Sequence, residues 1–213
     1  MKIIDISGVL ENGMWSYEPP IPKVHIKRVA SIDKIGWEAH QISFATISGT
    51  YLEASAHLIK GGVTIDQLKP EDMIKEAVVI KVPDKKPLEH ITVRDLESNK
   101  ARISKGDALL ISTGWERMWN EEDFVKKSPH FTEESMGWVI ERKISILGLD
   151  IPSSEDPQNG DGLNKALFRS GALLLAPLVN LAQISKNKVK LIALPLKVKE
   201  VCGCPCRALV LES

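Results

Sequence analysis

The stretch Ile47-Ser-Gly-Thr-Tyr51-Leu-Glu53-Ala-Ser55-Ala-His57 decides how this chain is interpreted. It follows a run of residues typical of a β-strand, contains a Gly-Thr turn, and then carries polar side chains at positions 51, 53, 55 and 57. If this segment stays extended, these four polar side chains lie on one face, because side chains alternate between the two faces of an extended chain. A carboxylate and an imidazole would then converge.

Glu53 and His57 have two interpretations. A histidine within hydrogen-bond reach of a carboxylate is held in one tautomer and gains basicity, which is the usual arrangement for general base catalysis. The alternative is that Glu53 is solvated and His57 is a hydrogen-bonded histidine of a core or a turn. The spacing of the two residues does not decide between them.

Working outward, the composition indicates an ordinary globular protein. The 213 residues are 43% apolar and 26% charged, which excludes the disordered and fibrous classes. Lys plus Arg and Asp plus Glu both number 28, so no net field attracts nucleic acid or a membrane surface. We therefore expect a small-molecule substrate or ligand as the partner.

The chain shows no sign of export or membrane insertion. Its N-terminal apolar run is short and is interrupted by Asp5 and Glu11, unlike a secretory signal. No segment approaches the roughly 18 apolar residues of a membrane span. The three cysteines are clustered at positions 202, 204 and 206, which does not suit a disulfide framework. The cytoplasm is the expected location.

Local patterns predict a mixed α/β fold that is rich in sheet. Short β-branched runs predict strands at residues 2–6, 24–30, 41–46, 77–82, 108–113, 144–149, 172–175, 191–194 and 208–211. Helical signals are fewer: a short turn at 64–68, helices that begin near Thr92 and Thr132, and a helix at 163–170 that ends at Gly171. No repeat or linker divides the chain, so a single domain over 1–213 is expected.

The opening stretch resembles the signature His-x-Gly-Thr-His-x-Asp-x-Pro-x-His of the cyclase family, which includes bacterial kynurenine formamidases and isatin hydrolases. Gly49, Thr50 and His57 match it. Further blocks resemble the family in the same order, namely Asp5-Ile-Ser with Asn12-Gly-Met14, Lys105 to Trp115, Gly148 to Ser153 with Asp156-Pro157, Ile192 to Leu196, and Pro205-Cys-Arg207. The resemblance implies the swivelling β/β/α cyclase-like fold, a sheet-rich core with a few flanking helices, and assembly as a homodimer or homotetramer.

The family's metal ligands are mostly replaced. Where the signature has two histidines and an aspartate, this chain has Ile47, Tyr51 and Glu53, and a later histidine and glutamate align with Asn164 and Ala176. Isoleucine and alanine cannot donate to a metal, whereas zinc prefers imidazole, thiolate or carboxylate ligands. No cofactor is therefore expected; the alternative is zinc or manganese held by Glu53 and His57.

The resemblance implies a cyclase-family hydrolase, similar to arylformamidases, that acts on a small cyclic or aromatic amide or carbonyl compound. The expected acid and base groups are His57 and Glu53, with Tyr51 beside them. The expected substrate-pocket residues are Trp15, Tyr17, Thr50, Asp150 and Asn164. Two rival functions are a metal hydrolase with substitute ligands and a catalytically inactive protein that binds a small ligand or serves in assembly.

Several side chains keep more than one interpretation. The cysteines at 202, 204 and 206 could hold a metal, fill a buried sheet end, or supply one reactive thiol beside His57. Asp150 either faces the site or caps the turn after its strand. Trp115 and Trp119 either line the pocket or pack in the core.

Overall fold

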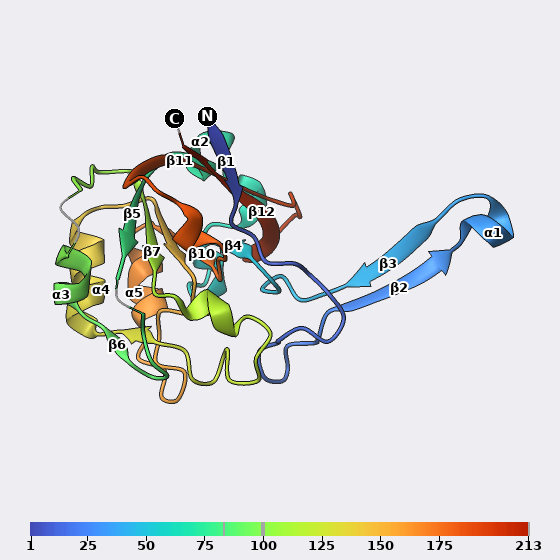
Figure 1. The fold of residues 1–213 in the computed structure, drawn as a ribbon, viewed down its shortest axis with the longest axis horizontal. Helices are drawn as coiled ribbons and strands as arrows, with labels where there is room; N and C mark the ends of the chain where they lie inside the picture. Colours follow the sequence, from blue (N-terminus) through green and yellow to red (C-terminus); the bar gives the residue numbers. More distant parts are fainter. Residues whose placement is uncertain (83, 99–100, 213) are drawn as a thin grey trace.

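The chain folds around a closed sheet, seen in a computed structural model that describes residues 1–82, 84–98 and 101–212. The strands of this sheet are β1 (Lys2–Asp5), β4 (Tyr51–Glu53), β5 (Ile74–Lys81), β7 (Ala108–Ser112), β9 (Ile146–Leu149), β10 (Leu173–Ala176), β11 (Lys188–Pro195) and β12 (Gly203–Glu212). They are ordered β1-β12-β11-β5-β7-β9-β10-β4, and β12 also pairs with β4. This additional pairing closes the sheet into a barrel-like body (Figure 1).

The middle of the sheet is parallel and buried on both faces. β5, β7, β9 and β10 run parallel to one another, whereas the other pairs of this sheet are antiparallel. In β7, Leu109 and Ile111 belong to one hydrophobic cluster, and Ala108 and Leu110 belong to a second one. A strand covered on both faces should be apolar at successive positions, which explains the run Ala-Leu-Leu-Ile.

Short helices cover the body, and their capping residues are where the sequence predicts them. The helices are α2 (Pro70–Met73), α3 (Val93–Glu97), α4 (Glu133–Glu141) and α5 (Leu163–Arg169), with 3-10 turns η1 (Ser55–His57), η2 (Ile65–Gln67), η3 (Trp115–Met118) and η4 (Leu181–Gln183). The hydroxyls of Thr92 and Thr132 accept hydrogen bonds from backbone N–H groups in the first turns of α3 and α4. Gly171, after α5, has a φ of 89°, as predicted for a helix end.

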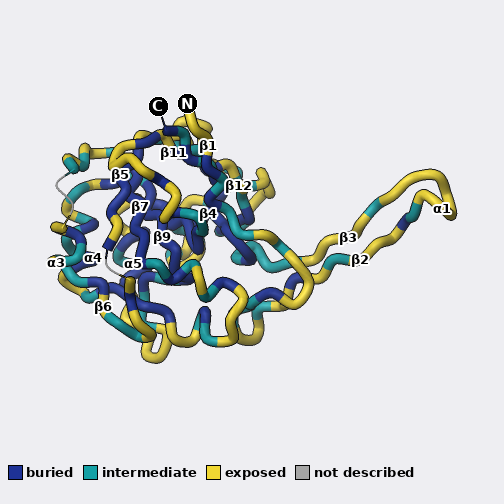
Figure 2. Tube along the Cα trace, viewed as in Figure 1, coloured by how far each residue is buried: buried dark blue, intermediate teal, exposed yellow. Residues whose placement is uncertain are grey.

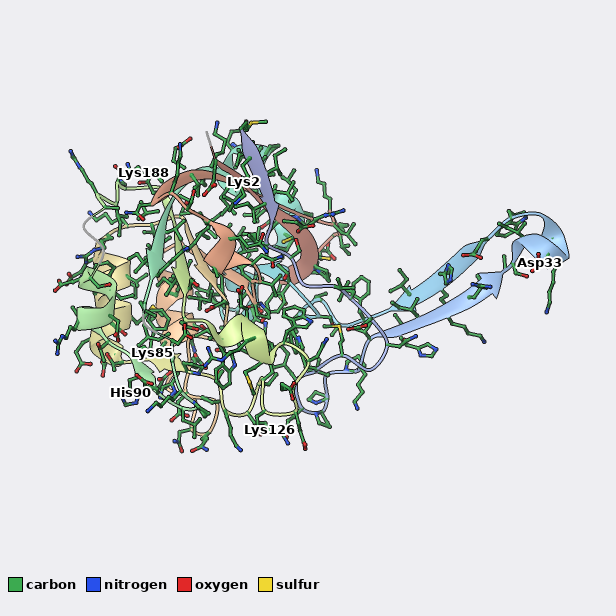
Figure 3. The ribbon with its side chains drawn as sticks, viewed as in Figure 1. Lys2, Asp33, Lys85, His90, Lys126 and Lys188 are labelled. Atoms are coloured by element: carbon green, nitrogen blue, oxygen red, sulfur yellow. The ribbon has the colours of Figure 1, made fainter. Side chains whose placement is uncertain are left out.

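One hairpin extends away from the body. It consists of β2 (His25–Ala30), the short helix α1 (Ile32–Ile35) and β3 (Ala39–Ser43), and we call residues 25–43 the arm. β2 and β3 form a separate two-stranded sheet that projects from the barrel, with Asp33 at its tip (Figures 1 and 3). Figure 2 shows that most of the arm is exposed. The sequence predicted both strands but not their separation from the barrel.

A second small sheet lies beside α3 and α4. It pairs β6 (His90–Ile91) with β8 (His130–Phe131) in parallel. Close to His90 (Figure 3), the Lys85 ammonium donates hydrogen bonds to Glu89 and Asp95, at 3.1 and 2.9 Å. The contact with Asp95 holds the segment between β5 and α3 against α3.

The predicted mixed α/β, sheet-rich fold is confirmed. Each of the nine predicted strands overlaps an observed one, whereas β6 and β8 are two-residue strands that sequence periodicity did not reveal. Within the described ranges, none of the helices is long and apolar enough to cross a membrane.

Candidate active site

The candidate site is built where β4 ends. Tyr51 and Glu53 lie on one face of β4, and β4 is held between β10 and β12, with Glu53 opposite Leu174 and Gly203. Both neighbouring pairings stop at Glu53, and the chain then turns into η1. The Glu53 side chain is therefore fixed at the closing seam of the barrel.

The condition that the chain stays extended from Tyr51 to His57 is not met, because β4 ends at Glu53. Ser55–His57 forms a 3-10 turn, because Ala56 donates to the Val63 carbonyl and the Ser55 hydroxyl accepts from the Val63 N–H. These bonds fold the chain back on itself. The turn nevertheless brings His57 to Glu53, with 3.1 Å between Nδ1 and Oε1.

Burial keeps the Glu53 and His57 pair uncharged at neutral pH. The Glu53 side chain is only 3% exposed, and burial, together with the negative charge of Glu155, raises its pKa to about 8. Burial lowers the pKa of His57. A protonated carboxyl therefore faces a neutral imidazole, so the pair can both supply and accept a proton. The interpretation of Glu53 as a solvated residue is wrong.

Two phenols form the adjoining wall. The hydroxyls of Tyr17 and Tyr51 are 2.8 Å apart, and the Tyr17 hydroxyl donates to the Pro152 carbonyl at 2.9 Å. Burial raises the pKa of both phenols, so both remain protonated. Three distant segments meet here, because Tyr17 precedes the arm, Tyr51 lies on β4 and Pro152 follows β9.

Cys202 contributes a thiol to the same place. Its Sγ is 3.6 Å from His57 Nδ1 and 4.0 Å from Thr46 Oγ1. The structure describes all three cysteines, and Cys202 is the one that contacts His57. Cys204 is 1% exposed, and Cys206 lies further along β12. The sequence alone does not identify which cysteine contacts His57, because this depends on how β12 aligns with β4.

Asn164 orders a loop beside Glu53. Its side-chain amide donates to the Ser153 hydroxyl at 2.9 Å, and its carbonyl oxygen accepts from the Ser154 hydroxyl at 2.6 Å. Its backbone N–H donates to the Glu155 carboxylate. Sequence reasoning missed Glu155, whose charge acts on Glu53. The adjacency of Asp156-Pro157 to the family block at 148–153 was the available signal.

The polar atoms of Thr50 and Asp150, two predicted pocket residues, form hydrogen bonds with other parts of the barrel and its loops. The Thr50 hydroxyl accepts from the Gly8 N–H at 3.0 Å and donates to the Pro177 carbonyl at 2.6 Å. The fully buried Asp150 carboxylate accepts from the Thr113 hydroxyl and from the backbone N–H groups of Thr113 and Gly114. Asp150 therefore caps the turn after the neighbouring strand β7, and not the turn after its own strand β9.

Trp15 and Trp119 form an aromatic cluster with Tyr17 and Phe124. The Trp15 ring meets the rings of Tyr17 and Trp119 edge-on, with centroids 5.5 and 5.4 Å apart. Trp115 is 1% exposed, and its indole N–H donates to the Phe124 carbonyl. Trp115 and Trp119 therefore pack in the core, and Trp15 joins that core to the phenol wall.

The residues present do not fit the metal site that the resemblance implies. The Tyr51 hydroxyl is engaged with Tyr17. Ile47 and Ala176 have no donor atoms, and the Asn164 amide is bonded to Ser153 and Ser154. Among the residues that the structure describes, no group of three or more His, Cys, Asp and Glu side chains is suited to holding a metal ion.

Comparison with known proteins agrees with the fold. A kynurenine formamidase of Bacillus cereus is 26% identical over 209 residues, which cover 97% of this chain and 96% of the relative. The solved structure of isatin hydrolase A from Ralstonia solanacearum matches with a TM-score of 0.89 at 23% identity, and covers 100% of this chain and 92% of that one.

A further solved structure, described as a potential metal-dependent hydrolase with cyclase activity, matches with a TM-score of 0.79 at 22% identity, over 100% of this chain and 98% of that one. The family model described as "Putative cyclase" matches residues 4–156. That match spans well over half of the sequence and contains part of β1 and all of β2 to β9, including the Glu53 and His57 pair. The chain therefore belongs to the cyclase family.

Proposed function

We propose that this protein is a hydrolase of small aromatic amides, in which Glu53 and His57 handle protons without the binuclear metal site of its relatives. The observation that carries the proposal is the contact of buried Glu53 with His57, with 3.1 Å between Oε1 and Nδ1 and pKa values displaced in opposite directions. The substrate class comes from relatives named kynurenine formamidase and isatin hydrolase.

The pair has the two protonation states that amide hydrolysis requires. Neutral His57 accepts the proton of the attacking nucleophile and passes it to the departing amine, while protonated Glu53 lies beside the imidazole. The Phe168 ring, 6.5 Å from the His57 ring between centroids, and the two phenols offer apolar and hydrogen-bonding surface to an aromatic substrate. We therefore still propose that Trp15 and Tyr17 line the pocket, with Tyr51 beside the acid and base groups. Asn164 supports the loop behind them.

The test is hydrolysis of formanilide and ring opening of isatin by purified protein, with and without prior treatment with a chelator. We expect activity that survives the chelator, and a loss of about 10²- to 10⁴-fold in H57Q and E53Q. E122Q, a substitution of an exposed glutamate, is the control and should behave as wild type.

Near-stoichiometric zinc or manganese in the purified protein, with activity lost to the chelator, would overturn the metal-free part and favour substitute ligands. Absence of turnover on either substrate would favour the inactive ligand-binding alternative. In that case H57Q should leave the biological role intact.

We also propose that the protein is a homo-oligomer that uses the arm. Five apolar residues of the arm are each more than half exposed, namely Val29, Ile32, Ile35, Trp37 and Ile42. A two-stranded hairpin standing alone is marginally stable, and exposed apolar patches mark contact surfaces. A second copy of the chain, with the same arm, would stabilise the hairpin and cover its exposed apolar residues.

A further inference from the structure

We propose that Cys202 is the nucleophile of this site, so that amide hydrolysis passes through an acyl-thioester on its Sγ. The inference rests on the proposed hydrolase function and deepens it by naming the attacking atom. The relatives' metals would activate water, a contribution that side chains replace poorly. A site without suitable metal donors needs a better nucleophile than neutral water, and a thiol beside a base is one.

The position of Cys202 is set by the closing seam of the barrel. β12 pairs antiparallel with β4, with Gly203 opposite Glu53, so the residue before Gly203 lies next to the turn that carries His57. An added Cβ on Gly203 would lie 3.2 Å from the Leu52 carbonyl oxygen, so glycine permits this close approach. The Cys202 thiol thereby reaches 3.6 Å from His57 Nδ1, which is within range for a hydrogen bond to sulfur.

The electrostatics require His57 to act as the base at the moment of attack. Burial raises the pKa of the Cys202 thiol, so the resting group is the thiol, not the thiolate. Burial also holds His57 neutral, which leaves a nitrogen able to accept the thiol proton. Glu53 contacts the same Nδ1, which has one lone pair, so His57 accepts the thiol proton when the hydrogen of the Glu53 carboxyl is not bonded to that nitrogen.

Access and the histidine contact together distinguish Cys202 from the other two cysteines. Cys202 is partly exposed, and the His57 side chain is 31% exposed, so a small substrate can reach both groups. Cys204 is 1% exposed. Cys206 is partly exposed like Cys202, but burial raises the pKa of its thiol to about 12, and it lies four residues further along the chain, which makes it a matched control.

The reaction balances without an oxidant or a further reactant. Sγ attacks the amide carbonyl carbon as its proton passes to His57 Nδ1, and the carbonyl electrons move to oxygen. Collapse of this adduct breaks the C–N bond, the leaving amine takes the proton from Nδ1, and a thioester remains on Cys202. Water then loses a proton to Nδ1, adds to the thioester carbonyl and displaces sulfur, which takes the proton back. The sum is amide plus water giving amine plus acid.

The decisive experiment is acid quenching of the full-length protein during formanilide turnover, followed by intact and peptide mass spectrometry. We expect one added formyl group on the peptide that contains Cys202, its loss in C202A, and a fall in kcat of about 100-fold or more in C202A. C206A should retain both the adduct and the rate. Turnover in C202A at the wild-type rate, with no adduct in wild type, would overturn the proposal while leaving the hydrolase function standing.

Alkylation by iodoacetamide tests the thiol independently of any substrate. Cys202 should react faster than Cys206 in wild type, and H57Q should remove most of that advantage. If formanilide and isatin are not turned over, the hydrolase function fails. The nucleophile assignment then fails as well unless this histidine-dependent reactivity is observed. Equal alkylation of Cys202 in wild type and H57Q contradicts the assignment in either case.

Discussion

At the scale of single residues, Glu53 shows how burial alters the chemistry of a side chain. It is an acid with a pKa of about 8, against an ordinary value of 4.5, because its carboxyl is desolvated at the barrel seam. Between these two values the folded protein binds the proton that the unfolded chain has released. The free energy of unfolding must therefore fall as the pH rises through this window.

E53Q removes this pH dependence, since glutamine cannot ionise. We expect the variant to unfold at a higher temperature than wild type at about pH 9, and the difference between them to shrink at about pH 5, where Glu53 is protonated in the folded state. Thermal unfolding followed by circular dichroism at both pH values measures the difference in unfolding temperature between E53Q and wild type. E122Q should track wild type throughout, and a wild-type advantage that grows toward high pH would refute the assignment of a protonated Glu53.

Sequence alone found part of this site. The spacing of Glu53 and His57 and the family signature identified the pair, although the chain between them turns and does not stay extended. The contacts of Tyr17 with Tyr51, and of Cys202 with His57, join residues 34 and 145 positions apart. Such contacts depend on strand order and register, which local patterns do not encode.

At the scale of elements, local chemistry set the helix boundaries well. Thr132 caps α4 through its hydroxyl, which accepts from the Ser135 N–H at 3.1 Å, and α4 buries Met136 and Val139 against the sheet. The threonine, the acidic first turn and the helical spacing of the apolar residues are all visible in sequence. The arm is the contrary case, because its strand signals do not reveal what they pair with.

T132A should lower the free energy of unfolding by about 1 kcal/mol, because the first turn of α4 loses its hydrogen-bonded cap. T132S keeps the hydroxyl and serves as the matched control, with most of the stability retained. Urea unfolding of the three proteins gives the comparison. Equal losses in both variants would mean that the threonine methyl group, not the cap, carries the contribution.

At the scale of the whole molecule, the fold joins a stable body to a projecting arm. The body is a barrel-like sheet with two hydrophobic clusters, whereas the arm has its apolar side chains in solvent. The family likeness covers nearly the whole chain, so this overall shape could be anticipated through resemblance. One domain over residues 1–213 and assembly through the arm remain predictions.

The double variant I35K/W37K should shift the protein toward the monomer, because two charges on the arm cannot be buried against a second copy at low cost. Light scattering after size exclusion measures the mass. V63K, which changes an exposed apolar residue of the body, is the control and should leave the mass unchanged. A wild-type protein that is monomeric at all concentrations tested would rule out the arm contact.

The pairing of β12 with β4 also imposes an order of events during synthesis. The ribosome makes residues 51–57 long before residues 203–205, yet these segments are neighbours in the finished barrel. A nascent chain therefore carries Glu53 and His57 without their β12 neighbours until residues 202–205 have emerged, and only then is the site complete. A premature stop before residue 202 would leave β4 with an open edge and no Cys202, and therefore a product prone to aggregation instead of a slow enzyme.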